Sequence, residues 1–117
     1  MTVILPVLKF LAALATMITG GIALVKPKSV FGFTGLIAEG GRGISEIRSI
    51  MGAGILALGA VPMILPNGQT FMMLGIAYLA VAVVRFFSMI FDHAFEASNK
   101  ISLVVEIVLG VILVFPG

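Results

Sequence analysis

The sequence predicts an all-α integral membrane protein, a four-helix bundle with antiparallel up-down topology and short connections. Of its 117 residues, 61% are apolar and 10% are charged, against about 45–50% and about 25% in ordinary globular domains. Four spans of about 20 residues each would leave about 37 residues for ends and connections. We therefore expect a single transmembrane domain over residues 1–117, without room for a sizeable catalytic domain outside the bilayer.

The first predicted span covers residues 3–25, where only Pro6 and Lys9 interrupt a long apolar run. This run is longer than the apolar core of about 7–15 residues that is typical of a secretory signal, so we expect the span to be retained. A Lys-Pro-Lys sequence ends the helix and begins a connection over residues 26–43. The apolar stretch 30–38 is too short to cross a bilayer, so we expect the connection to lie at the membrane interface.

Three further spans are predicted over residues 44–65, 70–91 and 101–115. A Pro-Asn-Gly-Gln sequence, which is a strong signal for a tight turn, separates the second span from the third. A short polar connection that contains His93 separates the third span from the fourth. Connections this short make neighbouring helices antiparallel.

The basic residues are distributed unevenly between the two predicted sides of the membrane. Only Lys9 lies on the side of the termini, whereas six lie on or near the other side: Lys26, Lys28, Arg42, Arg48, Arg85 and Lys100. Lys and Arg are retained on the cytoplasmic side, or on its organellar equivalent. We therefore expect both termini on the non-cytoplasmic side of a prokaryotic inner membrane or of an organellar membrane such as the thylakoid.

Each predicted span carries one stripe of small and polar residues, through which helices associate in lipid. Steps of three or four residues place each set on one helix face. The stripes are Ala12, Ala13, Thr16, Thr19, Gly20 and Ala23; Ser45, Arg48, Ser49, Gly52, Ala53 and Gly59; Gly75, Tyr78, Ala82, Arg85, Ser88 and Asp92; and Asn99, Ser102, Glu106 and Gly110. We expect all four stripes to face the interior of one bundle.

Two charged residues in the last two spans are expected to pair. A charge near the centre of a bilayer costs about 2.5–3.5 kcal/mol on insertion scales, so it needs a partner. Arg85 lies seven residues before Asp92, and Glu106 lies seven residues after Asn99. Antiparallel helices therefore bring Arg85 and Glu106 to the same depth, about 10 Å inside the connection. We predict an ion pair between them.

A wider polar cluster is predicted around this pair, at one end of the bundle. Its members are Glu46, Arg48, Arg85, Ser88, Asp92 and Glu106. The cluster either locks the helices in register or forms an ion or proton path or a pocket for an anionic head group. No catalytic residue is predicted.

Cofactor and metal chemistry is not expected. The chain contains no cysteine, which excludes disulfides and thiolate metal sites. Its single histidine, His93, lies in a polar connection and is expected to be solvated rather than to bind a metal or a pigment. No cofactor and no metal is predicted, although the composition is compatible with a bound lipid or pigment. The net charge of +2 is too small and too dispersed for nucleic-acid binding.

Three sparse motifs carry a resemblance to a known family. They are Glu46-x-Arg48-x-x-x-Gly52 in the second span, Arg85-x-x-Ser88-x-x-x-Asp92 at the end of the third, and Glu106 in the fourth. From about Lys26 onward the chain resembles small four-helix membrane proteins classed as a domain of unknown function. Similar sequences have a glycine after the aspartate, where this chain has His93. The resemblance implies the same charged positions and no particular activity.

The expected function is that of a non-enzymatic accessory or structural subunit, packed against a larger respiratory, photosynthetic or transport complex. Its expected partners are membrane lipids and other integral membrane subunits, and not nucleic acid. Two alternatives remain open. One is a small proton- or ion-coupled transporter or channel, and the other is a lipid or isoprenoid binder with Arg48 and Arg85 holding a head group. A lipid-modifying enzyme is the least favoured, because a lone histidine without a nucleophile makes no recognisable site.

Overall fold

The computed structural model describes residues 3–116, which contain helices and no strand. In chain order the helices are α1 (Ile4–Val25), the 3₁₀ helix η1 (Pro27–Ser29), α2 (Val30–Thr34), α3 (Gly40–Glu46), the π-helix η2 (Ile47–Gly54), α4 (Ile55–Ile64), α5 (Gly68–Phe91) and α6 (Ala97–Val114). Because α3, η2 and α4 follow one another without a break, they form one rod, Gly40–Ile64. This rod and the helices α1, α5 and α6 are each long and apolar enough to cross a membrane.

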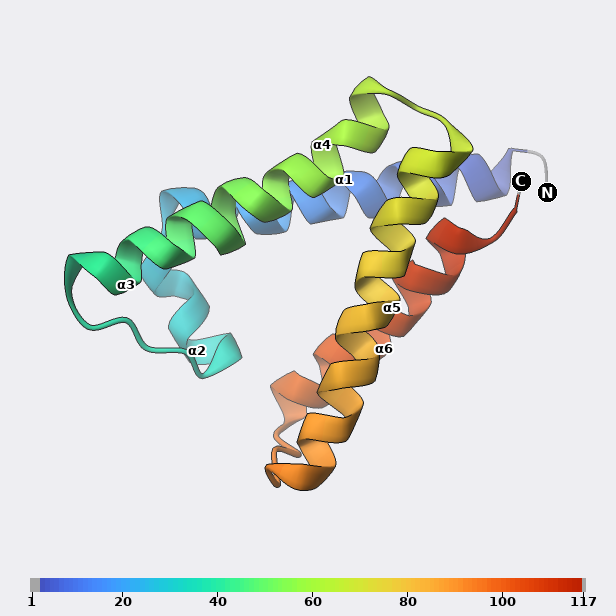
Figure 1. Cartoon of the computed structure of the whole chain (residues 1–117). Helices are drawn as coiled ribbons and strands as arrows, with labels where there is room; N and C mark the ends of the chain where they lie inside the picture. Colours follow the sequence, from blue (N-terminus) through green and yellow to red (C-terminus); the bar gives the residue numbers. More distant parts are fainter. Residues whose placement is uncertain (1–2, 117) are drawn as a thin grey trace.

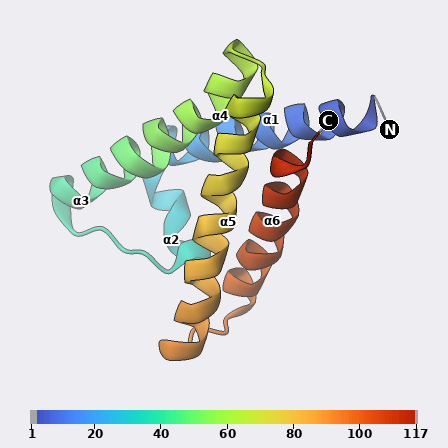
Figure 2. The same ribbon diagram turned by 45° about the vertical axis from the view of Figure 1, so that its right-hand side comes forward.

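The four long helices associate as two hairpins (Figure 1). In the first hairpin α1 packs along the rod of α3, η2 and α4, and in the second α5 packs along α6. The two hairpins cross steeply, meet near the α4–α5 turn, and diverge toward α2 and the α5–α6 connection (Figure 2). A single closed bundle with up-down order is therefore not confirmed, because the stripes pair two by two instead of converging on one axis.

Direct backbone contact holds the first hairpin together. A Cβ atom at Gly20 would lie 2.4 Å from the amide nitrogen of Leu56, and one at Gly59 would lie 2.6 Å from the carbonyl oxygen of Ala13. Only glycine permits such an approach, as expected for helices that associate through small residues. The predicted stripe of α1 is buried apart from Thr19, which is exposed.

The rod contains an eight-residue π-helix, η2, which the sequence did not predict. In this rare conformation hydrogen bonds join residues i and i+5, so the turns are wider than in an α-helix. Residues spaced three or four positions apart then no longer lie on one face of the helix. Of the predicted stripe, Gly52 and Gly59 are buried, whereas the other members are exposed: Ser45, Arg48, Ser49 and Ala53.

Small residues also bring the two helices of the second hairpin close together. A Cβ atom at Gly75 would lie 2.8 Å from Cβ of Leu113, and one at Gly110 would lie 2.6 Å from Cδ2 of Leu79. The predicted turn before α5 is confirmed, since Asn67 caps the helix by accepting hydrogen bonds from the amides of Gln69 and Thr70. Helix α6 begins at residue 97 rather than 101, because its first turn is polar and escaped a prediction based on hydropathy.

Two polar contacts join the hairpins where they meet. The buried Lys9 of α1 donates a hydrogen bond from Nζ to the carbonyl oxygen of Phe115 at 2.6 Å. The hydroxyls of Thr16 on α1 and Tyr78 on α5 lie 2.5 Å apart. Around them four buried residues form an apolar core: Ala12, Ala13, Leu74 and Leu113. These contacts anchor the hairpins to each other at one end, and at the other end α2 approaches α6.

Candidate functional site

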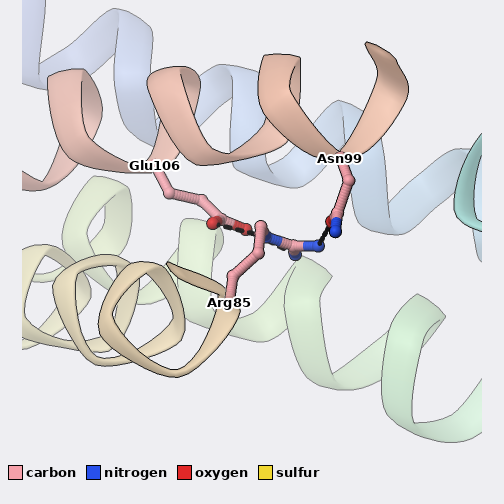
Figure 3. A network of polar contacts seen from close by, with 3 residues as sticks. All are labelled: Arg85, Asn99 and Glu106. Carbon is pink, nitrogen blue, oxygen red and sulfur yellow. Dashed lines mark hydrogen bonds and ion pairs between the residues drawn. The ribbon is translucent and has the colours of Figure 1, made fainter. Parts of the chain in front are cut away.

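The predicted ion pair between Arg85 and Glu106 is present on the facing sides of α5 and α6 (Figure 3). Nε of Arg85 donates to Oε1 of Glu106 at 2.8 Å, and Nη2 donates to Oε2 at 2.7 Å. Nη1 of Arg85 donates to Oδ1 of Asn99 at 2.7 Å. This planar, two-pronged contact is the strongest geometry that a guanidinium and a carboxylate can adopt.

The carboxylate of this pair lies deeper than the guanidinium. The exposed fraction of the side chain is 11% for Glu106 and 30% for Arg85. A buried carboxylate is costly unless a partner neutralises it and hydrogen bonds occupy its oxygens. Both oxygens of Glu106 are bonded to Arg85, so the pair is electrically neutral as a unit.

Asn99 extends the pair into the α5–α6 connection. The sequence placed Asn99 on the inner face of the fourth span but did not predict this role. Its Nδ2 donates to the carbonyl oxygen of Ala94 at 2.8 Å, which ties the first turn of α6 to the connection. Next to Ala94, His93 has a φ of 52°, in the left-handed region that favours glycine. A glycine would adopt this conformation without strain, whereas His93 adopts it at some cost.

Arg85 also lines a cavity of about 550 Å³ between the two hairpins, which we call the inter-hairpin cavity. On one side it is bounded by residues 32–36 and by Met51, and on the other by Arg85 and the start of α6. The side chains from α6 and the residues just before it are those of Ala94, Glu96, Ser98, Asn99 and Ser102. The cavity exists because the hairpins diverge at this end while α2 folds back toward α6 (Figure 2).

A second, apolar hollow of about 490 Å³ adjoins the same arginine along α5, and we call it the α5 groove. It is lined by Ala80, Val81, Val84, Arg85, Ser88 and Asn99. Since Arg85 and Asn99 line both hollows, the inter-hairpin cavity, which has the larger share of polar lining, adjoins a more apolar surface at this point.

Arg85 retains unused hydrogen-bonding capacity. A guanidinium carries five N–H donors, and three of them are used by Glu106 and Asn99. Among residues 3–116 no acceptor takes the remaining two, which belong to Nη1 and Nη2. These donors are available to a molecule that enters either hollow.

The other members of the predicted cluster lie apart from the ion pair. Ser88 donates to Oδ2 of Asp92 at 2.6 Å at the exposed end of α5. Glu46 pairs with Arg42 one turn earlier on α3, and both side chains are exposed. Arg48 is exposed in η2, and no ion pair joins it to another residue within the described part of the chain. The six residues therefore do not meet. Glu46 and Arg48 are kept away from Arg85 because the hairpins diverge toward this end, and Ser88 bonds to Asp92 instead of to the ion pair.

Over residues 3–116, no group of three or more His, Asp or Glu side chains is arranged to hold a metal ion. Each buried side-chain nitrogen or oxygen in the same range has a hydrogen-bond partner.

A family model described as a domain of unknown function (DUF4345) matches residues 4–116. The match confirms the resemblance seen in the charged motifs and extends it over the first predicted span. No curated protein and no solved structure matches the chain.

Proposed function

The chain belongs to the family described as a domain of unknown function (DUF4345), and we propose that it is a non-enzymatic integral membrane protein that binds a lipid between its two hairpins. The observation that carries this proposal is the inter-hairpin cavity, which has the Arg85 guanidinium in its wall and adjoins the α5 groove at Arg85 and Asn99. A hollow with polar groups beside a more apolar one matches the two parts of a lipid. Among the alternatives that the sequence left open, this geometry favours the lipid binder.

The membrane setting is supported by the outer surface of the helices. All four long helices expose large apolar side chains; examples are Val25, Ile64, Phe91 and Val104. Burying such faces in hydrocarbon is favourable by about 25 cal/mol per Å² of apolar surface. In the proposed arrangement the four helices cross the bilayer in up-down order with both termini on the non-cytoplasmic side. The cavity then opens on the cytoplasmic side, where Lys26 and Lys28 lie.

The depth of Arg85 also supports a lipid head group as the ligand. The guanidinium lies about 10 Å inside the α5–α6 connection along the helix, near the level where head groups meet hydrocarbon in the proposed arrangement. Its two unused N–H donors suit the acceptor oxygens of a phosphate or an ester. Because Glu106 neutralises its charge, the arginine offers hydrogen bonds rather than a strong net field.

The experiment compares two neighbouring substitutions at the start of α6. Ser98→Phe places a ring at the wall of the cavity, whereas Ala97→Phe places the same ring at an exposed position outside it. Each protein is purified in mild detergent, and the retained lipid is measured by native mass spectrometry. We expect lipid in fixed proportion to the wild-type chain and to Ala97→Phe, and little with Ser98→Phe. Equal lipid content in all three proteins, or none in the wild type, would contradict the proposal.

An accessory subunit of a larger membrane complex is the second candidate function. The observation that favours it is a row of exposed phenylalanines on α5. The ring centroids of Phe86 and Phe87 are 5.6 Å apart, and those of Phe87 and Phe91 are 6.4 Å apart. Aromatic side chains are enriched in protein interfaces. A large particle of defined stoichiometry in mild detergent would support this function, and a particle of this chain alone would oppose it.

Proton- or ion-coupled transport has less support. An acidic residue that exchanges protons must be released from its partners during the cycle. For Glu106 this would break two charge-assisted hydrogen bonds to Arg85. The pair is therefore better suited to hold α5 and α6 in register and to present the remaining donors of Arg85.

A further inference from the structure

We infer that the inter-hairpin cavity selects a phospholipid whose head group carries a primary ammonium together with its phosphate. This inference rests on the proposed lipid binding and goes beyond it by naming the head-group chemistry. It is carried by the charges and donors that line the cavity. Among the common phospholipids, the head group that fits this description is phosphoethanolamine.

The charge balance of the cavity disfavours a purely anionic head group. Among the described residues, the charged side chains that line the cavity are those of Arg85 and Glu96. Since Glu106 neutralises Arg85 from behind, Glu96 leaves the lining of the cavity with one net negative charge. A head group with a phosphate alone would place a second negative charge beside this exposed carboxylate, and the two charges would repel each other. A head group that also carries a positive charge avoids this repulsion.

The donors for the phosphate lie on one side of the cavity. They are the two remaining N–H groups of Arg85 and the hydroxyls of Ser98 and Ser102. No side chain caps the first turn of α6. The amide of Asn99 donates to the carbonyl oxygen of Glu96, so the amides of Ala97 and Ser98 are the ones left to add to these donors. Backbone amides at the start of an 18-residue helix favour a phosphate through both hydrogen bonding and the helix dipole.

The acceptor for the ammonium is the carboxylate of Glu96. It immediately precedes α6, its side chain is exposed, and no ion pair joins it to another residue of the described chain. A primary ammonium can donate three hydrogen bonds, so Glu96 can bind it by a charge-assisted contact. A quaternary choline has no N–H to donate, and a glycerol head group has no positive charge. The same carboxylate therefore discriminates among three common lipid classes.

The α5 groove provides the place for the acyl chains. It begins at Arg85 and Asn99 and continues along the apolar side chains of Ala80, Val81 and Val84. A head group bound at the start of α6 thus directs its chains along the lipid-facing side of α5. This continuity favours a membrane lipid over a soluble phosphate compound of the same head-group chemistry.

The test reconstitutes the full chain in vesicles containing equal amounts of phosphatidylethanolamine, phosphatidylcholine and phosphatidylglycerol. After extraction in mild detergent, the lipids retained by the protein are quantified by mass spectrometry. We expect phosphatidylethanolamine to be enriched about tenfold over each of the others, as one charge-assisted hydrogen bond allows. Glu96→Gln should retain as much total lipid but lose the enrichment. Glu39→Gln, an exposed carboxylate outside the cavity, should behave like the wild type.

Each of the other possible outcomes would contradict either the head-group assignment or lipid binding itself. Retained lipid without preference, or a preference that survives in Glu96→Gln, contradicts the head-group assignment and leaves lipid binding intact. A wild-type protein that retains no lipid contradicts both. A competition arm adds soluble phosphoethanolamine, which lacks acyl chains and should displace little lipid. Displacement as complete as that by added phosphatidylethanolamine would show that the ligand is a soluble compound and not a lipid.

Discussion

Arg85 and Glu106 lie at the same depth on α5 and α6 and share two parallel hydrogen bonds, from Nε to Oε1 and from Nη2 to Oε2. The pair holds the second hairpin in register at the end where the hairpins diverge and α2 lies nearest to α6. At the other end Lys9 bonds to the chain just after α6. Polar contacts therefore stabilise α6 in its middle and just beyond its C-terminal end.

Removing the charge of Glu106 should destabilise the second hairpin. Glu106→Gln leaves the half-buried guanidinium of Arg85 without its counter-ion, and we expect a loss of about 2 kcal/mol in the free energy of unfolding. This loss is measured by unfolding the wild-type and variant proteins in mixed detergent micelles. In a double-mutant cycle with Arg85→Ala and Glu106→Ala, we expect the double variant to be more stable than the sum of the single effects implies. Additive losses would mean that the two residues are not coupled.

Adding one methyl group at the contact of the first hairpin should separate its helices. In Gly20→Ala the new Cβ would lie 2.4 Å from the amide nitrogen of Leu56 and 2.7 Å from the carbonyl oxygen of Gly52, and neither backbone atom can move aside easily. We expect a loss of about 1–3 kcal/mol. The neighbouring Gly21→Ala is the matched control, because nothing lies within 4 Å of its Cβ position. If both variants are equally stable, the contact between the backbones is not as close as described.

The bond between Lys9 and Phe115 should restrict the angle between the hairpins. Lys9→Met keeps the length of the side chain but removes the donor, so we expect a broader distribution of distances between α1 and α6. The chain has no native cysteine, which allows spin labels at Leu8→Cys and Val111→Cys to report this distance. Lys28→Met, at an exposed basic residue, is the control. If the distribution of distances is unchanged, apolar packing alone fixes the angle between the hairpins where they meet.

The proposed orientation in the membrane can be checked with single cysteines and a thiol reagent that does not cross membranes. Lys28 and Gln69 are both exposed; Lys28 lies in η1, just after α1, and Gln69 lies in the first turn of α5. In the proposed arrangement they lie on opposite sides of the membrane. Gln69→Cys should react in intact spheroplasts, and Lys28→Cys only after the membrane is opened, because basic residues are retained on the cytoplasmic side. The reverse pattern would invert the proposed topology.

Much of the second hairpin could be predicted from the sequence, because its register depends on local periodicity. The capping residue Asn67 sets where α5 begins, the small residues Gly75 and Gly110 let α5 and α6 approach closely, and the pairing of Arg85 with Glu106 follows from counting residues outward from the α5–α6 connection. The first hairpin was harder to predict from the sequence. The π-helix η2 changes the face on which Arg48 lies, and nothing in the composition of residues 47–54 indicates it.

The sequence by itself determined the four apolar helices, their breaks and the Arg85–Glu106 pair, since hydropathy and helical period act within one helix or between neighbours in the chain. Only the tertiary structure decided how the hairpins meet. Contacts between distant residues, such as Lys9 with Phe115 and Thr16 with Tyr78, join them at one end and leave the other end open. That opening is the inter-hairpin cavity, and it separates Glu46 and Arg48 from Arg85, because a crossing angle is a property of the packed surfaces and not of either helix alone.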